Sequence, residues 1–211
     1  MKKIIFLLAA SVLGFQVAGL SQTRVGLTAG VAVASMHGSE AEGGNGRAGF
    51  MGGIVLETPV VKALTFRPSI SYVQKGETLP HPDGTLIDKT YAALRYTEFN
   101  ADFLFYASGA SNAGFFIGAG PSIAFNLPSK RVAITDDVKT ATIVHFGKEN
   151  TNDLRGTDWG LNFTTGWRTK NGFLINFNYN KGIRNLVTEG HDGDLKNQYF
   201  GIQLGCFLNN K

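Results

Sequence analysis

The chain of 211 residues is poor in three features that define common classes of protein: cysteine, charge and long apolar runs. Cys206 is the only cysteine, so no disulfide can form within the chain. Charged residues make up 17%, which is low for a soluble domain, whereas glycine is abundant with 27 residues. After the first segment, no window has the roughly 18 consecutive apolar residues of a membrane helix. A disulfide-stapled secreted domain and a helical membrane bundle are therefore excluded.

The first segment, MKKIIFLLAASVLGFQVAGLSQ, has the pattern of a secretory signal peptide. Lys2 and Lys3 precede an apolar run, and small residues before Gln22 suit a signal peptidase. We therefore expect a signal peptide at residues 1–21 and a mature domain at residues 22–211; a retained membrane anchor is the alternative. Without the two lysines, 18 of the 20 basic residues remain against 16 acidic ones. This small excess gives no reason to expect nucleic-acid binding.

Apolar residues recur at every second position over eight stretches of the mature domain. In GFFIGAGPSIAFN, residues 114–126, large apolar side chains alternate with Gly, Ser and Ala rather than with Lys or Glu. The same period is present in TRVGLTAGVAVAS, LTFRPSISYVQKG, YTEFNADFLFY, DWGLNFTTGWR, GFLINFNYN and YFGIQLGCFL, and less regularly in AGFMGGIVLE. Strict alternation is typical of β-strands with two different faces, so we predict eight strands.

Short and long connections alternate along the chain. The short ones lie around TPVVK, SGASNA and TKN, and the long polar ones span about residues 36–48, 76–92, 127–156 and 186–197. An up-and-down barrel of the outer membrane has this pattern, with tight periplasmic turns and longer external loops. The sequence therefore predicts an all-β, eight-stranded antiparallel transmembrane barrel, located in the outer membrane with both termini in the periplasm.

The two faces of the predicted strands fit lipid on one side and a narrow bore on the other. A sheet that spans hydrocarbon must close on itself, because no water is present to satisfy its backbone groups. Eight strands leave a bore that side chains just fill, and Gly, Ser, Thr and Asn suit that space. A lipocalin-like soluble cup, the alternative, would carry many Lys and Glu on its wet face. Aromatic rings toward the strand ends are expected at the membrane interfaces: Tyr72, Tyr96, Tyr106, Trp159, Trp167 and Tyr179.

Charged side chains with inward parity are the candidate functional residues of the bore. There are six of them: Arg67, Lys75, Glu98, Asp102, Asp158 and Arg168. The strands that carry the first four form one hairpin, so opposite charges can pair across it. An unpaired ion in a narrow bore is costly, whereas hydrogen-bonded ion pairs are tolerated. We expect these residues to form ion pairs that plug the bore; a selectivity lining or a ligand site is the alternative.

The long loops contain residues that an enzyme or a metal site would also use. His145 has acidic neighbours at Asp136, Asp137 and Glu149, and lipid-modifying barrels use such residues at the outer rim. No serine stands in a nucleophile motif, however, and HDGD at 191–194 lacks the further acidic positions of a calcium loop. We therefore expect no enzymatic activity, no metal site and no cofactor.

The loop at residues 127–156 is the candidate partner-binding segment. Its pieces RVAITDD and TATIVHFG alternate well enough to extend the barrel as a hairpin above the membrane. An exposed β edge can recruit a partner strand. We expect outer-membrane lipid to be one partner of the barrel, with other envelope or secretion proteins bound through this loop; a solvated hairpin without a partner is the alternative.

Four of the stretches, LTFRPSISYVQKG, GFFIGAGPSIAFN, NFNYNKGIRNL and YFGIQLGCFL, resemble the PorT-like outer-membrane β-barrel family. The resemblance covers residues 22–211 and rests on loose motifs, among them the Gly-Pro-Ser of the fifth strand. It implies an eight-stranded barrel of the OmpA and OmpX type and, for the namesake, a role in secretion and gliding.

We therefore expect a barrel with a plugged polar bore that acts through its external loops as a structural, binding or accessory component of the envelope. A narrow channel for small solutes and a lipid-modifying enzyme are the alternative functions.

Overall fold

The computed structural model describes residues 23–41, 43–79, 87–109 and 113–208, so the predicted signal peptide lies outside the described residues. In these ranges no helix is long and apolar enough to span a membrane. The described chain forms one antiparallel sheet of ten strands: β1 (Arg24–His37), β2 (Asn45–Val61), β3 (Leu64–Lys75), β4 (Glu77–Leu79), β5 (Lys89–Tyr106), β6 (Gly114–Thr135), β7 (Val138–Val144), β8 (Thr157–Arg168), β9 (Phe173–Gly182) and β10 (Lys196–Phe207).

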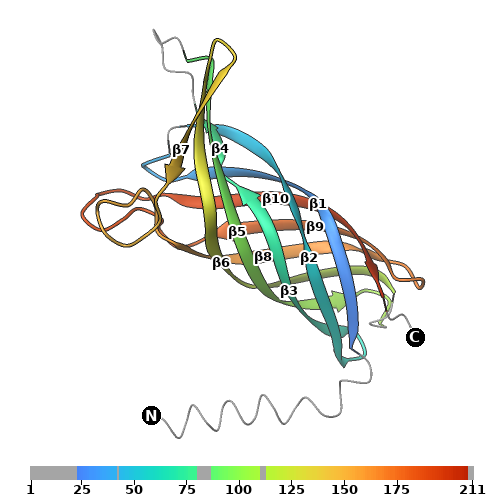
Figure 1. The fold of residues 1–211 in the computed structure, drawn as a ribbon. Helices are drawn as coiled ribbons and strands as arrows, with labels where there is room; N and C mark the ends of the chain where they lie inside the picture. The colour runs from blue at the N-terminus through green and yellow to red at the C-terminus, as the bar shows by residue number, and fades with distance from the viewer. Residues whose placement is uncertain (1–22, 42, 80–86, 110–112, 209–211) are drawn as a thin grey trace, which may run out of the picture.

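Eight of these strands form a closed ring (Figure 1). Around the ring the order is β1, β2, β3, β5, β6, β8, β9 and β10, and each strand is antiparallel to the next. The ring closes because β10 pairs with β1, from Gly26 opposite Phe207 to His37 opposite Lys196. A ring without a free edge satisfies the backbone groups of every wall strand, as hydrocarbon requires. The predicted eight-stranded antiparallel barrel is confirmed.

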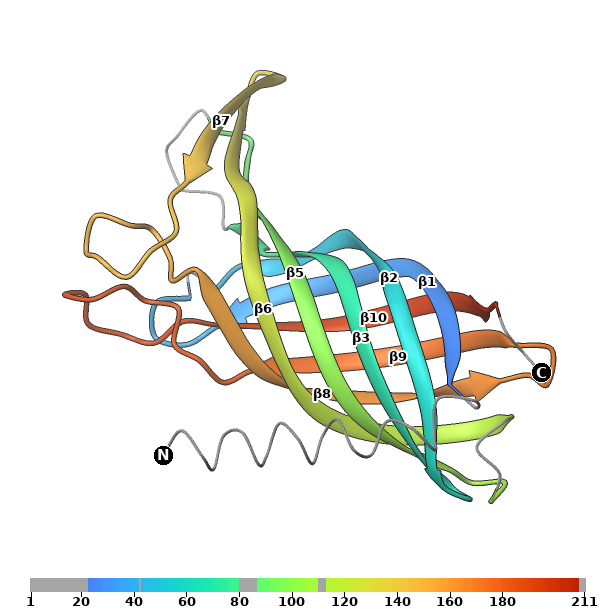
Figure 2. The ribbon, with the colours of Figure 1, turned by 60° about the horizontal axis from the view of Figure 1, so that its bottom comes forward.

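The two remaining strands lie at one end of the ring. β4 bridges β2 and β5 just beyond the end of β3. β7 pairs with the last part of β6, and the resulting β6–β7 hairpin projects from the rim (Figures 1 and 2). Its turn consists of Asp136 and Asp137, which both have positive φ, as a two-residue turn of type I′ requires. The sequence predicted this hairpin within residues 127–156.

The connections sort by length between the two ends of the barrel. The short ones, which join β2 to β3, β5 to β6 and β8 to β9, lie opposite the hairpin, at the end of the barrel where β10 ends (Figure 2). We call this the short-turn end. Three of the four connections at the other end, the long-loop end, are longer, whereas the β1–β2 connection has the same length as the β5–β6 connection. The predicted alternation of short and long connections is therefore present except between β1 and β2, where residues 36–48 were expected to form a long loop.

Side chains alternate between the outer wall and the bore. In β9, Phe173, Ile175 and Phe177 are exposed, whereas Leu174 and Asn176 are buried. The outer wall carries large apolar side chains on every ring strand, among them Val31, Ile54, Ile70, Phe103, Ile117, Phe163, Ile175 and Ile202. Because no other described part of the chain covers these side chains, they form the surface that a bilayer would cover.

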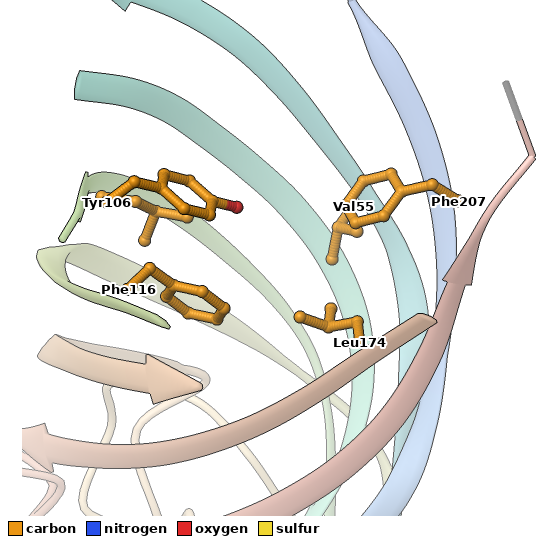
Figure 3. Packing of buried hydrophobic residues seen from close by; sticks show 6 residues of the cluster. Val55, Tyr106, Phe116, Leu174 and Phe207 are labelled. Atoms are coloured by element: carbon orange, nitrogen blue, oxygen red, sulfur yellow. The ribbon is translucent and has the colours of Figure 1, made fainter. Parts of the chain in front are cut away.

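Glycines inside the bore make room for larger side chains that face them. A Cβ atom on Gly201 would lie 2.6 Å from Sδ of Met51, and one on Gly166 would lie 2.7 Å from the ring of Phe116. The abundance of inward glycine therefore reflects a bore that is already filled. At the short-turn end, an apolar layer narrows it further (Figure 3): Val55, Leu104, Tyr106, Phe116, Leu174 and Phe207.

Two of the aromatic residues expected at the membrane interfaces lie elsewhere. Tyr96 and Tyr106 are fully buried in the bore, so the prediction was wrong for them. Both have the inward parity of Glu98 on the same strand, and this parity decides where a strand residue points. Trp159 and Trp167 are exposed on the outer wall near the two ends of β8, where interfacial rings are expected.

Candidate functional site: two ion clusters in the bore

The first cluster of charges surrounds one carboxylate at the short-turn end. Glu57 Oε1 accepts from Nη2 and Nε of Arg67 at 2.5 and 3.0 Å, and Glu57 Oε2 accepts from Nη1 of Arg168 at 2.5 Å. The hydroxyl of Tyr106 donates to Glu57 Oε1 at 3.0 Å. Arg67 lies 4.3 Å from the ring centre of Phe116, which adds a cation–π contact. We call Glu57, Arg67 and Arg168 the Glu57 cluster.

The second cluster surrounds one ammonium group toward the long-loop end. Lys75 Nζ lies 2.9 Å from Glu98 Oε2 and 3.0 Å from Asp158 Oδ2. Tyr199 donates to Glu98 Oε1 at 2.6 Å, and the amide of Asn197 donates to Asp158 Oδ2 at 3.1 Å. We call Lys75, Glu98 and Asp158 the Lys75 cluster.

Both clusters are removed from solvent, so their charges must be compensated within the bore. Each of the six side chains is 3% exposed or less. A buried ion that loses its partner costs several kcal/mol, because its hydration is not replaced. The ion pairs tie strands from different parts of the ring together: β2, β3 and β8 in the Glu57 cluster, and β3, β5 and β8 in the Lys75 cluster.

Amide side chains fill the bore between the two clusters. Asn176 donates to Asn178 Oδ1 and to Gln203 Oε1 at 2.9 and 3.3 Å, and Gln203 in turn donates to Thr28 at 3.1 Å. On the other side of the bore, Asn162 donates to Asp102 Oδ2 at 2.8 Å. A cavity of about 20 Å³ is left among these groups, enough for one water-sized species.

The structure places all six predicted bore residues inside the barrel. It brings Lys75, Glu98 and Asp158 into one cluster and directs Arg67 and Arg168 to a shared partner. Asp102 stands opposite Arg67 in the β3–β5 register, but the guanidinium of Arg67 turns to Glu57 and Asn176 instead.

Glu57 was missed by the sequence analysis, although it is the centre of its cluster. It lies in the least regular of the predicted strands, four residues before the end of β2. Its parity is the signal that could have found it, because Met51, Val55 and Glu57 are buried while Ile54 and Leu56 between them are exposed.

Loop residues cover the mouth of the bore at the long-loop end. The ring of Phe146 packs edge-on against Tyr96 at 6.3 Å, and Val144 and Leu154 lie in the same apolar group. Arg155 fixes this loop to the next one by donating to the carbonyl oxygen of Val187 at 2.7 Å. A cavity of about 60 Å³ remains under the loops and is lined by apolar and charged side chains.

The loop histidines that the structure describes, His37, His145 and His191, are not gathered into a shared metal site, and His81 lies outside the described residues. His145 lies 3.6 Å from Asp153, and both are largely exposed. Asp136 and Asp137 are at the opposite end of β7, so these two acidic candidates do not lie beside His145 in space. Among the described residues, no group of three or more His, Cys, Asp or Glu side chains could hold a metal ion.

The comparison with known protein families agrees with the barrel architecture. Residues 14–188 match the family model described as outer membrane protein beta-barrel domain. No curated protein sequence matches the chain. The crystal structure of Neisserial surface protein A is similar at 11% identity and a TM-score of 0.45, covering 86% of this chain and 96% of that one. Ail, the attachment invasion locus protein of Yersinia pestis, is similar at 13% identity and a TM-score of 0.46, covering 88% and 98%. Likeness at this level gives no information on what this chain binds.

Proposed function

The chain belongs to the outer membrane protein beta-barrel domain family, and we propose that this closed barrel binds a protein partner through the β6–β7 hairpin. Members of this family lie in the outer membrane, so the apolar outer wall contacts lipid. The partner is an extended segment of another envelope protein. The resemblance to PorT-like barrels favours a partner from a secretion apparatus.

The observation that carries the proposal is the exposed edge of β7. Six of its seven residues are exposed, and only Val144 is buried. In the described part of the chain β7 pairs with β6 on one side and with no strand on the other. Natural edge strands are commonly protected by proline, bulges or several charges, whereas β7 has one charged residue, Lys139. Such an edge accepts a further strand through main-chain hydrogen bonds.

The hairpin is also held firmly enough to present that edge. β6 runs without a break from Gly114 in the wall to Thr135 at the tip. Lys89 and Thr90 of β5 pair with Ile134 and Ala133, so a second wall strand supports it on the side away from β7. A pre-ordered edge binds with a smaller loss of conformational entropy than a mobile loop.

The filled bore favours a binding role over a channel. The Glu57 cluster and the Lys75 cluster cross the bore at two levels, and amide side chains occupy the space between them. Passage of a solute would require these buried ion pairs to separate, which is costly.

A shortened hairpin tests the proposal. Replacing residues 132–141 by Asn-Gly joins Arg131 to Thr142, which already stand opposite each other, by a favoured two-residue turn. The barrel is expected to fold, as shown by heat-modifiable migration on a gel. A photo-crosslinker at Thr140 of the full-length hairpin should capture a protein in intact envelopes, and the shortened barrel should no longer co-purify with it.

Two controls separate this function from its alternatives. The same crosslinker at Asn171, in a short turn, should not capture that protein, and Lys139→Ala should retain it because the edge is unchanged. Equal co-purification with the shortened barrel would refute binding at the edge. A steady conductance of the wild-type barrel in planar bilayers would support a channel instead.

A further inference from the structure

We propose that the middle of the bore binds one small monovalent cation, of the size of sodium, between Asp102, Asn162 and Asn100. This site lies between the Glu57 cluster and the Lys75 cluster and is separate from the hairpin. Its ligands are one carboxylate and two amides. The site therefore contains only one of the His, Cys, Asp and Glu side chains that most metal sites combine in groups of three or more.

Three oxygen atoms at this level of the bore have no hydrogen-bond partner among the described residues. They are Oδ1 of Asp102, Oδ1 of Asn162 and Oδ1 of Asn100, and each atom is buried. The side chains of Asp102 and Asn162 are 4% and 2% exposed. All three residues line the same cavity of about 20 Å³. Buried polar atoms are nearly always satisfied, so an unsatisfied group of three points to a bound species.

The orientation of the two amides is determined by their other contacts. The Asn162 amide nitrogen donates to Asp102 Oδ2 at 2.8 Å, so a flipped amide would set its oxygen against a carboxylate oxygen. The Asn100 nitrogen donates to Glu98 Oε1 at 3.2 Å, and the same reasoning holds there. Each amide therefore directs its oxygen, not its nitrogen, away from these carboxylates.

A cation fits three acceptors better than a water molecule does. A water has two hydrogens to donate, whereas a cation attracts every oxygen around it. Asp102 also forms no direct ion pair among the described residues. Arg67 is near enough to attract its charge but is bound to Glu57 and Asn176, and Lys75 is bound within its own cluster. A buried carboxylate without a directly bound cation is costly.

The size and charge of the cavity select the kind of cation. About 20 Å³ accommodates one species the size of a water molecule and excludes a hydrated or an organic ion. Asp102 is the one carboxylate among the three proposed ligands, and calcium or magnesium sites generally use more carboxylates or retained waters. A single desolvated monovalent ion is the best match.

Thermal unfolding in detergent tests the site. The wild-type barrel should unfold at a higher temperature in sodium chloride than in choline chloride of equal ionic strength, because choline is too large for the cavity. Asp102→Asn should abolish this difference. The control Asp153→Asn removes a carboxylate from an exposed loop and should retain it.

Thallous ion in crystals of the wild-type barrel gives a second measurement that needs no variant. An anomalous peak beside Asp102 Oδ1 is expected. If that peak is absent and the unfolding temperature is the same in both salts, water or a proton on Asp102 satisfies these oxygens and the proposal is wrong. Should Asp102→Asn fail to fold, the thallium peak decides alone.

Discussion

At the short-turn end of the bore a carboxylate lies between two guanidinium groups, whereas nearer the long loops an ammonium group lies between two carboxylates. The clusters differ in the contacts that the two outer charged groups keep when the central ion is removed. Arg67 keeps a bond to Asn176 and a contact with Phe116 even without Glu57. Glu98 and Asp158 share a single compact cation, and without it two like charges face each other across the bore. The two clusters should therefore respond unequally to the loss of their central ion.

Loss of the central cation should have the largest effect. Lys75→Met keeps the length and apolar stem of the side chain but leaves Glu98 and Asp158 buried without compensation. We expect the free energy of unfolding to fall by about 3–5 kcal/mol, the range for breaking a buried ion pair. Urea titration of the barrel folded into lipid vesicles measures it. Adding Glu98→Gln to the variant should restore part of the loss, and no recovery would argue against carboxylate repulsion.

Loss of the central anion should lower the stability of the barrel less than loss of the central cation. Glu57→Gln retains an acceptor oxygen for Arg67 or Arg168 and for Tyr106, and guanidinium groups are less strongly hydrated than ammonium groups. We expect the free energy of unfolding to fall by about 3 kcal/mol at most, the low end of that range. The same urea titration compares the two variants directly, and a larger loss than for Lys75→Met would reverse the ranking of the clusters.

An ion pair at the rim of the barrel should contribute least to the free energy of unfolding. Lys196 Nζ lies 2.8 Å from Asp194 Oδ2, but the two side chains are 28% and 40% exposed. Solvent screens such a pair, so Lys196→Ala should change the free energy of unfolding by about 0.5 kcal/mol or less. Repeating the titration at high salt should leave the buried clusters unchanged and remove what remains of the rim contribution. If Lys196→Ala lowered the free energy of unfolding as much as Glu57→Gln does, burial would not determine how much an ion pair contributes to stability.

Period-two alternation was sufficient to predict the wall of the barrel and the inward position of the six charged residues, because strand parity is a local property. It was also sufficient to place Lys75 near Glu98, since β3 and β5 are consecutive strands of the ring. The contact of Lys75 with Asp158 could not be predicted in this way. β3 and β8 are not neighbours in the ring, so their relative height depends on the stagger of every strand between them.

The middle of the bore was less predictable than its walls. The alternation predicts that Asn162 and Asn100 point into the bore. It does not predict that their side-chain oxygens lack hydrogen-bond donors. That shortage arises from which amide nitrogen reaches which carboxylate, and it depends on side-chain packing that no strand pattern encodes. Tyr96 and Tyr106 were misplaced for another reason: aromatic residue type was given more weight than parity.

The pairing of β10 with β1 has a consequence for biogenesis. The wall cannot be completed until Lys196–Phe207 has been synthesised and has met Arg24–His37, the earliest wall strand of the chain. Until that pairing forms, each of the two strands has one edge whose backbone N–H and C=O groups would have no hydrogen-bond partner in the hydrocarbon layer. We therefore expect an unfinished chain to need a chaperone or an insertion complex until its final strand has been synthesised. A chain truncated before β10 should not form a stable barrel in the bilayer.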